Sequence, residues 1–308
     1  MTDSPPDHDV ERAVRVLRDG GIIGLPTETV YGLAALAEDA DAVARVFEVK
    51  GRPRSHPLIV HLASVAQLDD WGVLDDNAHE LARRFMPGPL TLLVPRRSRV
   101  PDWVTGGRDT VALRIPNHPV AHALLEAVGT GVVAPSANRF GRVSPTTADH
   151  VAADLGDDVD LVLDGGPSAV GVESTIVECA EGRVRILRPG AVTAEQISAV
   201  VSVQTGPDDG DSRAPGMMKT HYAPVARVVL VESMTEADSE MNRARSAGLR
   251  SALVHHDDVE DYAESLYSDM RSADMAGVDV IVAVLPPEVG LGAAVRDRLM
   301  KAAARPEG

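Results

Sequence analysis

One segment of the sequence places cations where they could hold an anion. Lys50-Gly-Arg-Pro53 directly follows a predicted helix over residues 41–49, and Lys50 lies seven residues after Val43, in phase with the apolar face of that helix. Its ammonium should therefore point into the domain, where with Arg52 it could clamp phosphate oxygens through charge-assisted hydrogen bonds, each worth about 1.5–3 kcal/mol. Compensation of the dipole at a helix C-terminus is the plainer interpretation of the same lysine.

Further polar groups stand where apolar runs end, which suits them to bind a small polar ligand. Hydroxyls and a carboxylate follow a predicted strand in Leu25-Pro-Thr-Glu-Thr-Val-Tyr-Gly32, and small donors follow another in Ala134-Pro-Ser-Ala-Asn138. Open α/β sheets bind ligands at such strand ends. Alternation along a third strand puts Thr110 and Arg114 on one face. A capped turn and a structural ion pair remain the alternative explanations for the first segment and for Arg114.

Other recognisable chemistry is absent from the sequence or has a simpler explanation. There is no Gly-x-x-x-x-Gly-Lys-Ser/Thr phosphate loop, no His-Glu-x-x-His, no cysteine pair for zinc and no Gly-x-Ser-x-Gly elbow. A nucleotide would have to be bound by another device. His255-His-Asp-Asp258 resembles a metal site, but it joins a predicted strand to a predicted helix, and we expect a solvated helix cap there.

A mixed α/β sheet has to position these groups. Short β-rich runs alternate with amphipathic helical patterns, among them residues 41–49 and 78–86. Several strands follow one another without room for a helix, so the sheet should contain antiparallel pairs. The predicted strands span residues 22–25, 58–62, 90–95, 111–115, 132–134, 161–163, 174–178 and 184–187.

Composition marks one break, at residues 204–216, where Gly, Pro, Asp and Ser replace the apolar periodicity. We predict one domain over residues 1–203, a linker over 204–224 and a second domain over 225–308. The linker carries Met, His and Tyr between prolines in its last residues, so we expect that part to dock. The sequence after the linker predicts a small parallel, doubly wound domain, with strands at 226–231, 251–255 and 278–285 and helices at 236–247, 259–272 and 291–304.

Length and composition fit two ordinary globular domains. The chain has 308 residues, beyond the roughly 250–300 at which single cores stop growing, and 44% of its residues are hydrophobic. The 30 basic and 46 acidic residues give a net charge of −16, which weighs against an electrostatic grip on nucleic acid. The single Cys179, the lack of a basic and apolar leader and the lack of a long apolar run predict a cytoplasmic protein without a membrane helix.

Taken in order, nine segments of the chain resemble the threonylcarbamoyl-AMP synthases, the YrdC-type enzymes, in their longer two-domain form. The resemblance covers nearly the whole chain and implies a twisted mixed sheet with a large concave cleft, followed by a small Rossmann-like parallel domain. The segments are Pro26-Thr-Glu-Thr-Val-Tyr-Gly-Leu33, Lys50-Gly-Arg-Pro53 with Pro57-Leu-Ile-Val-His61, Pro87-Gly-Pro-Leu-Thr-Leu92, Arg114-Ile-Pro-Asn-His-Pro119, Ala134-Pro-Ser-Ala-Asn138, Ser144-Pro-Thr146, Glu173-Ser-Thr-Ile176, Leu187-Arg-Pro-Gly190 and His221-Tyr-Ala-Pro224.

The resemblance also implies a reaction and a set of binding residues. L-threonine, bicarbonate or carbon dioxide, and ATP with Mg²⁺ would give threonylcarbamoyl-AMP and pyrophosphate, and partner proteins would use the product to make threonylcarbamoyladenosine in tRNA. No resident metal site is implied. Threonine would be held by Thr29, His61, Arg114, the Ala134 backbone and Ser174. ATP would be held by Lys50, Arg52, His56, Thr110, Ser136, Asn138, Ser144, Arg188 and Tyr222, with Lys50 and Arg52 as the catalytic cations.

Two other functions stay open at this point. YrdC-like domains are associated with RNA, so the chain could be an RNA-binding module, although its net charge argues against this. Similar domains occur in enzymes that use carbamoyl phosphate, but the His221-Tyr-Ala-Pro224 segment and the appended domain favour the synthase. Position 56 departs from the pattern, with His where many relatives have Asn, and a histidine could make that contact depend on pH.

Overall fold

The structure is a computed structural model that describes residues 7–204 and 222–304. It contains a nine-stranded mixed sheet with strand order β7-β1-β2-β6-β3-β5-β4-β8-β9 and a three-stranded parallel sheet with order β10-β12-β11. The first sheet belongs to the N-terminal domain and the second to the C-terminal domain, which confirms the predicted fold class. The domain boundaries stay a prediction, because residues 205–221 of the predicted linker lie outside the described residues.

The N-terminal domain carries its helices between short strands. Its strands are β1 (Ile23–Leu25), β2 (Gly32–Leu36), β3 (Ile59–His61), β4 (Leu90–Pro95), β5 (Thr110–Arg114), β6 (Val132–Val133), β7 (Leu161–Val162), β8 (Thr175–Ala180) and β9 (Arg183–Arg188). Its helices are α1 (Asp7–Arg18), α2 (Ala40–Lys50), α3 (Leu68–Trp71), α4 (Asp76–Phe85), α5 (Asp102–Thr105), α6 (Pro119–Val128), α7 (Ala148–Leu155) and α8 (Ala194–Ser198), with 3₁₀ turns at Val65–Gln67 and Gly156–Asp158.

Every predicted strand of this domain is present, with each end within two residues of its predicted place. The expected antiparallel pairs are also present, including β8 with β9. Strand β2 was not predicted. Its sequence is Gly-Leu-Ala-Ala-Leu and four of its five residues are buried, so both faces are covered and no apolar alternation marks it as a strand.

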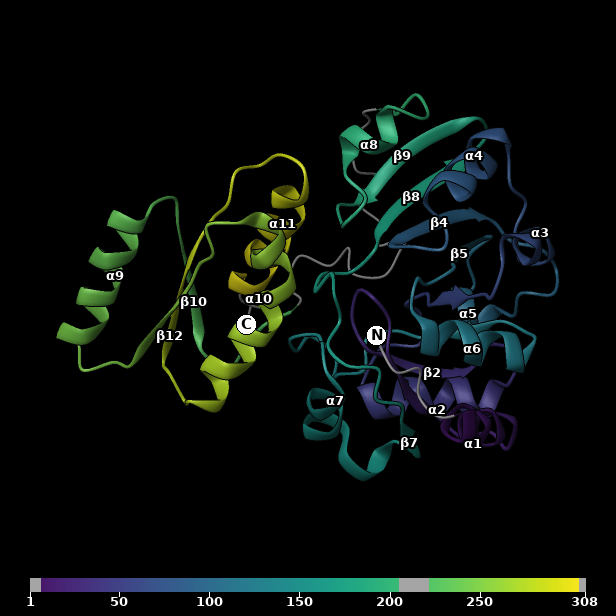
Figure 1. Ribbon diagram of the computed structural model, residues 1–308, viewed down its shortest axis with the longest axis horizontal. Coiled ribbons are helices and arrows are strands. Elements are labelled where there is room, and N and C mark those ends of the chain that lie inside the picture. Colours follow the sequence, from purple (N-terminus) through teal and green to yellow (C-terminus); the bar gives the residue numbers. More distant parts are fainter. Residues whose placement is uncertain (1–6, 205–221, 305–308) are drawn as a thin grey trace.

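The C-terminal domain has the predicted alternation of strands and helices. It comprises β10 (Arg227–Val231), α9 (Met234–Ser246), β11 (Ser251–Val254), α10 (Val259–Met275), β12 (Val280–Val284) and α11 (Leu291–Ala303). Figure 1 shows α9 on the outer side of its sheet and α10 and α11 on the side that faces the N-terminal domain. Asp258 accepts from the backbone N–H groups of Glu260 and Asp261, so the His255–Asp258 segment forms the expected cap of α10.

Helix α2 explains how the sequence delivers Lys50 to the interior. The Asp39 side chain begins the helix by accepting from the N–H groups of Asp41 and Ala42, and Gly51 ends it in the left-handed region at φ +65°. Lys50 is the last helical residue and is buried, as the helical phase predicts. The same face packs Val43, Val46 and Phe47 into the main core of the domain.

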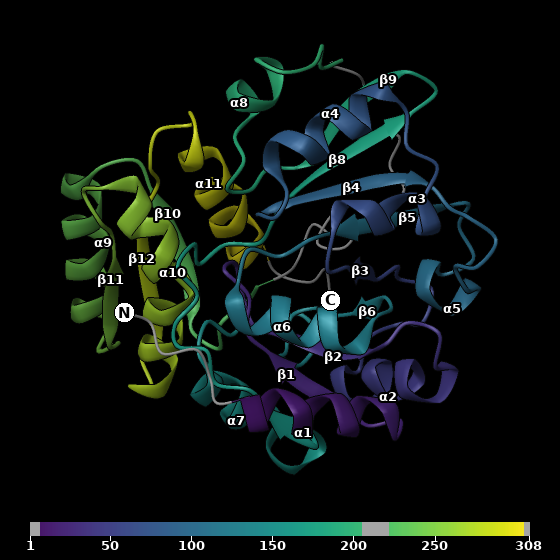
Figure 2. The same cartoon turned by 45° about the vertical axis from the view of Figure 1, so that its right-hand side comes forward.

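One of the apolar clusters contains residues of both domains. Tyr262, Leu266 and Tyr267 of α10 pack in one cluster with Val30 and Val172 of the N-terminal domain. Figure 2, a view turned by 45°, also shows α10 and α11 on the side of the C-terminal domain that faces the N-terminal domain. Within residues 7–204 and 222–304, every helix is too short or too polar to span a lipid bilayer.

Candidate functional site

Strand register gathers polar side chains on one face of the nine-stranded sheet. His61 at the end of β3 pairs with Arg114 at the end of β5, and Arg114 pairs in turn with Thr91 of β4. Strand alternation puts these three side chains on the same face. Further along the strands that face is apolar and carries the cluster Ile59, Leu93, Ala112 and Ile176.

His61, Arg114 and Ile59 of this face border a cavity of about 50 Å³ that has the ends of several strands in its wall. All five residues predicted to hold threonine line it: Thr29, His61, Arg114, Ala134 and Ser174. Four of the residues predicted to hold ATP line it too: Arg52, Ser136, Arg188 and Tyr222.

The other predicted ATP residues lie around this cavity but do not line it. Lys50 reaches under the turn that follows β6, where its Nζ donates to the carbonyl oxygens of Ser136 (2.5 Å) and Asn138 (2.6 Å). The Asn138 Nδ2 donates to the carbonyl oxygens of Arg139 and Arg142. The Ser144 hydroxyl donates to Glu173 Oε1 over 2.7 Å. These three side chains hold backbone or a neighbouring carboxylate in place.

His56 and Thr110 also lie outside the lining of the cavity. The His56 ring lies 5.6 Å from the Phe140 ring, and the Arg52 guanidinium carbon lies 6.0 Å from that same ring. Burial lowers the pKa of His56 below its usual 6.5, and Arg52 and Arg108 lower it further. Thr110 begins β5, at the opposite end of the strand from Arg114, although both side chains share a face as predicted.

Burial and mutual repulsion govern the charges around the cavity. Burial lowers the pKa of His61 to about 3, and the charge of Arg114 adds to the effect, so the imidazole is neutral. Burial likewise lowers the pKa of Arg52 to about 10, which leaves that guanidinium charged at neutral pH. Arg52, Arg114 and Arg188 give the lining three cations, against the carboxylate of Glu173 in the lining and that of Glu28 beside Arg114. The cavity is therefore suited to bind anionic groups.

Ser174 joins the two predicted halves of the site. Arg188, predicted for ATP, donates from Nε (3.1 Å) and Nη2 (2.8 Å) to the Ser174 carbonyl, and also from Nη2 to the Ser174 hydroxyl (3.1 Å). The same hydroxyl lies 2.7 Å from the Thr91 hydroxyl. Thr91 received no role from the sequence, although it lies within the Pro87–Leu92 segment, because only the strand register brings it to Arg114 and Ser174.

Two buried carboxylates at the site also received no role from the sequence. Glu28 Oε1 lies 2.9 Å from Arg114 Nη2, but the two groups are not aligned for a hydrogen bond, so this contact is an ion pair only. Glu28 stood in the polar segment after β1, yet nothing in that segment indicated Arg114 as its partner. Glu173 lines the cavity and accepts from Ser144, Tyr267 and Arg298, so side chains of both domains hold it.

The donor set does not fit a resident metal ion. Among residues 7–204 and 222–304 no three His, Cys, Asp or Glu side chains are grouped so that they could hold one. Three guanidiniums, a neutral imidazole and several hydroxyls can instead neutralise a carboxylate and phosphate oxygens and donate hydrogen bonds to them. The site can therefore bind an amino acid next to a polyphosphate.

Comparison with known proteins agrees with this chemistry. Residues 15–190 match the Sua5/YciO/YrdC family, described as telomere recombination, and residues 192–304 match the threonylcarbamoyl-AMP synthase C-terminal domain. The chain is 41% identical to the threonylcarbamoyl-AMP synthase of Bacillus subtilis, over 97% of this chain and 94% of that protein. It is 40% identical to the threonylcarbamoyl-AMP synthase of Pyrococcus abyssi, over 94% and 92%.

A solved structure matches over almost the same length. The crystal structure of P. abyssi Sua5 complexed with L-threonine aligns with a TM-score of 0.94, at 38% identity, over 98% of this chain and 96% of that chain. The agreement covers both domains. The chain therefore belongs to the family of threonylcarbamoyl-AMP synthases, in the long form that carries the C-terminal domain.

Proposed function

We propose that the cavity beside β3, β5 and β8 is where this chain joins L-threonine, bicarbonate or carbon dioxide, and ATP into threonylcarbamoyl-AMP, with release of pyrophosphate. The observation that carries the proposal is that the five expected threonine residues and four of the expected ATP residues line one cavity. Similarity to threonylcarbamoyl-AMP synthases along both domains supports this activity over RNA binding and over the use of carbamoyl phosphate.

Threonine would lie at the end of the cavity formed by Arg114, His61 and Ser174. The Arg114 guanidinium would neutralise the threonine carboxylate. In this structure the counter-ion of Arg114 is Glu28. The neutral His61 has an Nδ1 without a hydrogen-bond partner among the described residues, so it can bond to the amino acid without adding charge. Thr29, the Ala134 backbone and Ser174 would complete the contacts.

ATP would lie along the side formed by Arg52, Ser136, Arg188 and Tyr222. Threonine nitrogen adds to carbon dioxide and loses a proton to give a carbamate, and a carbamate oxygen then attacks the α-phosphorus. The bond from the α-phosphorus to the β-phosphate oxygen breaks, and pyrophosphate leaves. Arg52 and Arg188 would bind the charge that builds up on the phosphate oxygens, while Mg²⁺ would enter with ATP as part of the substrate.

Lys50, Asn138 and Ser144 would act on ATP mainly through the loop that they support. Lys50 and Asn138 fix the turn at residues 136–142, which carries Ser136 to the cavity wall. His56 would contact ATP as a neutral ring at pH 7, because its pKa is lowered. Tyr222, with φ +63°, is buried in the wall, as expected for a linker tail that docks, and we propose that it retains the nucleotide.

The product would pass to partner proteins that modify tRNA, and we expect the chain itself to bind tRNA weakly, given its net charge of −16. A cytoplasmic location remains part of this proposal.

Pyrophosphate release tests the proposed function. The purified protein, given Mg-ATP, should release pyrophosphate only when both threonine and bicarbonate are present. Release that needs neither of them, or turnover of carbamoyl phosphate instead, would contradict the proposal. So would a protein that only retards RNA.

A pair of arginine variants tests the threonine half of the site. Arg114→Gln should raise the KM for threonine by about tenfold or more, as expected for the loss of a charge-assisted contact, with little change in the KM for ATP. Arg185→Gln is the matched control, because Arg185 pairs with Glu178 on β8 and does not line the cavity. An unchanged KM for threonine in Arg114→Gln would rule out the assigned carboxylate contact.

A further inference from the structure

The C-terminal domain reaches the catalytic cavity through one carboxylate. Glu173 comes directly before Ser174, lines the cavity and is 7% exposed. Its Oε1 accepts from the Ser144 hydroxyl over 2.7 Å. Its Oε2 accepts from the Tyr267 hydroxyl of α10 over 2.8 Å and from Nε of Arg298 of α11 over 2.7 Å. Two of these three donors therefore belong to the C-terminal domain.

Arg298 is placed as a fixed charge at this contact. Its side chain is fully buried, and its Nη2 donates to the Pro189 carbonyl, one residue after Arg188, over 3.1 Å. Its guanidinium carbon lies 5.3 Å from the Tyr222 ring. Tyr222 stacks in turn on Tyr267, with ring centroids 5.6 Å apart. Arg298 therefore contacts three segments at the cavity: Glu173, the residue after Arg188, and Tyr222 at the end of the predicted linker.

The charges at this contact depend on one another. Burial would raise the pKa of Glu173, but Arg298 first and Arg188 second outweigh it and lower that pKa to about 2, so the carboxylate is ionised. Arg188 is thus the second cation that stabilises Glu173. It also donates to the carbonyl and hydroxyl of Ser174 and lines the cavity. Without Arg298, the buried Glu173 carboxylate would have Arg188 as its main cation. A buried charge without a close partner is costly, so Arg188 would be drawn away from Ser174 toward Glu173.

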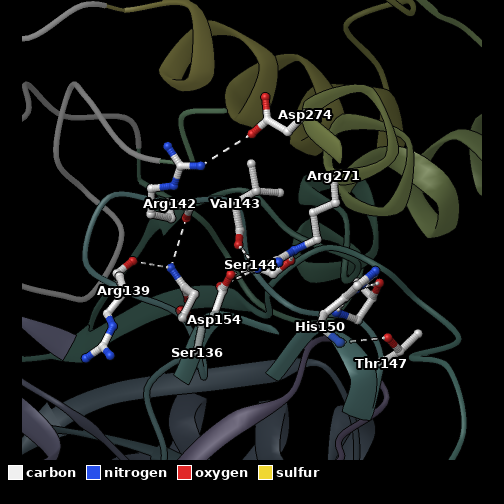
Figure 3. Close-up of polar contacts among 12 residues, drawn as sticks. Ser136, Arg139, Arg142, Val143, Ser144, Thr147, His150, Asp154, Arg271 and Asp274 are labelled. Atoms are coloured by element: carbon white, nitrogen blue, oxygen red, sulfur yellow. Dashed lines mark hydrogen bonds and ion pairs between the residues drawn. The ribbon is translucent and has the colours of Figure 1, made fainter. Parts of the chain in front are cut away.

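A second set of contacts fixes the loop on the opposite side of Glu173. Figure 3 shows Arg271 of α10 reaching the carbonyl oxygens of Val143 and Ser144 together with the carboxylate of Asp154. Asp274, one turn further along α10, pairs with Arg142. Helix α10 thus supports the loop that delivers the Ser144 hydroxyl to Glu173. The Ser144 contact of Glu173 is thus fixed by the loop, and the charge that neutralises Glu173 comes from Arg298.

We propose that Arg298 of the C-terminal domain is a positioning residue for the catalytic cavity: it neutralises Glu173, so that Arg188 and Ser174 keep the arrangement that binds the substrates. The C-terminal domain then does more than anchor the linker. It supplies the counter-charge that fixes the direction of a cavity arginine. This inference rests on the proposed function of the same cavity.

Three variants of the full-length protein test the inference. Arg298→Met should raise the KM for ATP and for threonine by about tenfold, the effect of disturbing one buried charge-assisted contact, while kcat falls less. Arg298→Lys keeps the charge, so both KM values should stay within about threefold of wild type. Arg296→Met is the matched control on the same helix, because Arg296 pairs with Glu232 inside the C-terminal domain, and its KM values should be unchanged.

A double variant separates positioning from simple attachment of the domains. In Arg298→Met/Glu173→Gln the Glu173 charge that would attract Arg188 is removed as well, while Asp297, the other carboxylate beside Arg298, keeps its ion pair with Lys301. Both KM values should therefore return toward wild type relative to Arg298→Met. An attachment role predicts no such recovery, since the double variant lacks the contact as well. Wild-type KM values in a folded Arg298→Met, a tenfold rise in Arg298→Lys, or no recovery in the double variant would each overturn the inference.

The result is distinguishable from failure of the proposed function. If wild-type protein releases no threonine-dependent pyrophosphate, the proposed function itself is wrong. Threonine binding measured by calorimetry gives a readout that does not need turnover, and affinity should fall in Arg298→Met but not in Arg296→Met. Thermal unfolding identifies any variant that fails to fold. If Arg298→Met does not fold, the KM values of Arg298→Lys and of the double variant are compared with those of wild type instead, and a tenfold rise in either variant overturns the inference.

Discussion

Lys50 is the clearest case of a catalytic candidate that also supports the backbone. Burial lowers the pKa of its ammonium well below the usual range, and the charge of Arg52 lowers it further. Two carbonyl oxygens, of Ser136 and Asn138, accept from it at short distances. These contacts predict that replacing Lys50 affects both the activity and the stability of the protein.

Replacement of Lys50 should therefore cost stability as well as activity. Lys50→Met leaves two carbonyl oxygens without this donor, and an unpaired buried acceptor costs about 1–3 kcal/mol. Arg52→Met is the matched comparison, since Arg52 donates to one carbonyl, that of Pro57. Urea unfolding should show a larger loss for Lys50→Met than for Arg52→Met, while both variants lose pyrophosphate release. Equal stability of Lys50→Met and wild type would refute the supporting role.

His61 should not titrate in the range where the protein works. Its pKa of about 3 follows from burial and from the adjacent Arg114 charge, so the ring stays neutral as pH falls from 8 to 5. The ring proton resonances of His61, assigned with His61→Asn, should stay constant over that range in nuclear magnetic resonance spectra. A titration midpoint of His61 between pH 5 and 8 would contradict this account of the cavity electrostatics.

At the scale of single elements, periodicity predicted most of the sheet and therefore much of the site. Strand alternation put Thr110 and Arg114 on one face, and helical phase pointed Lys50 inward; the structure confirms both placements. Neither rule applies to β2, which is buried on both faces, or to the Glu28–Arg114 pair, which joins the loop after β1 to the end of β5. Such contacts follow from sheet order, and one strand's pattern carries no information about that order.

One loop glycine shows how closely the elements of the two domains approach. Gly171 has φ +75°, and a Cβ added there would lie 2.2 Å from the Ala263 carbonyl oxygen in α10. Gly182, at φ +73° in the β8–β9 turn, has no atom within 4 Å of the corresponding position. The two positions therefore share a backbone conformation and differ in the space around them.

Gly171→Ala should therefore destabilise the protein more than Gly182→Ala. Both variants carry the strain of a left-handed alanine, roughly 1–2 kcal/mol, but only Gly171→Ala must also push α10 away from the loop before Glu173. Urea unfolding of the two variants isolates the cost of that displacement, and Gly171→Ala should in addition raise the KM for threonine. If the two variants unfold alike, α10 does not hold this loop as closely as the structure indicates.

At the scale of the whole molecule, the domains meet in a way that the sequence did not predict. Glu173 and Arg298 are 125 positions apart and belong to different domains, so no local period relates them. The family pattern included Glu173 in a motif but gave it no partner. The shared apolar cluster explains why these charges can be buried, because Tyr222, Tyr267 and Val172 exclude water around them. A buried pair of this kind is costly to separate, since either charge alone would be left without compensation.

The buried carboxylate should make the stability of the whole protein depend on acid. The pKa of Glu173 is about 2 in the folded protein and near 4.5 otherwise, so its contribution is complete above pH 4.5 and is lost as the pH falls toward 2. We expect the unfolding free energy of wild type minus that of Glu173→Gln to fall by on the order of 3 kcal/mol between pH 5 and pH 2. Glu181→Gln, which removes an exposed carboxylate in the β8–β9 turn, is the control variant. Urea unfolding at a series of pH values measures the difference, and parallel curves for wild type and Glu173→Gln would mean that this charge does not hold the domains together.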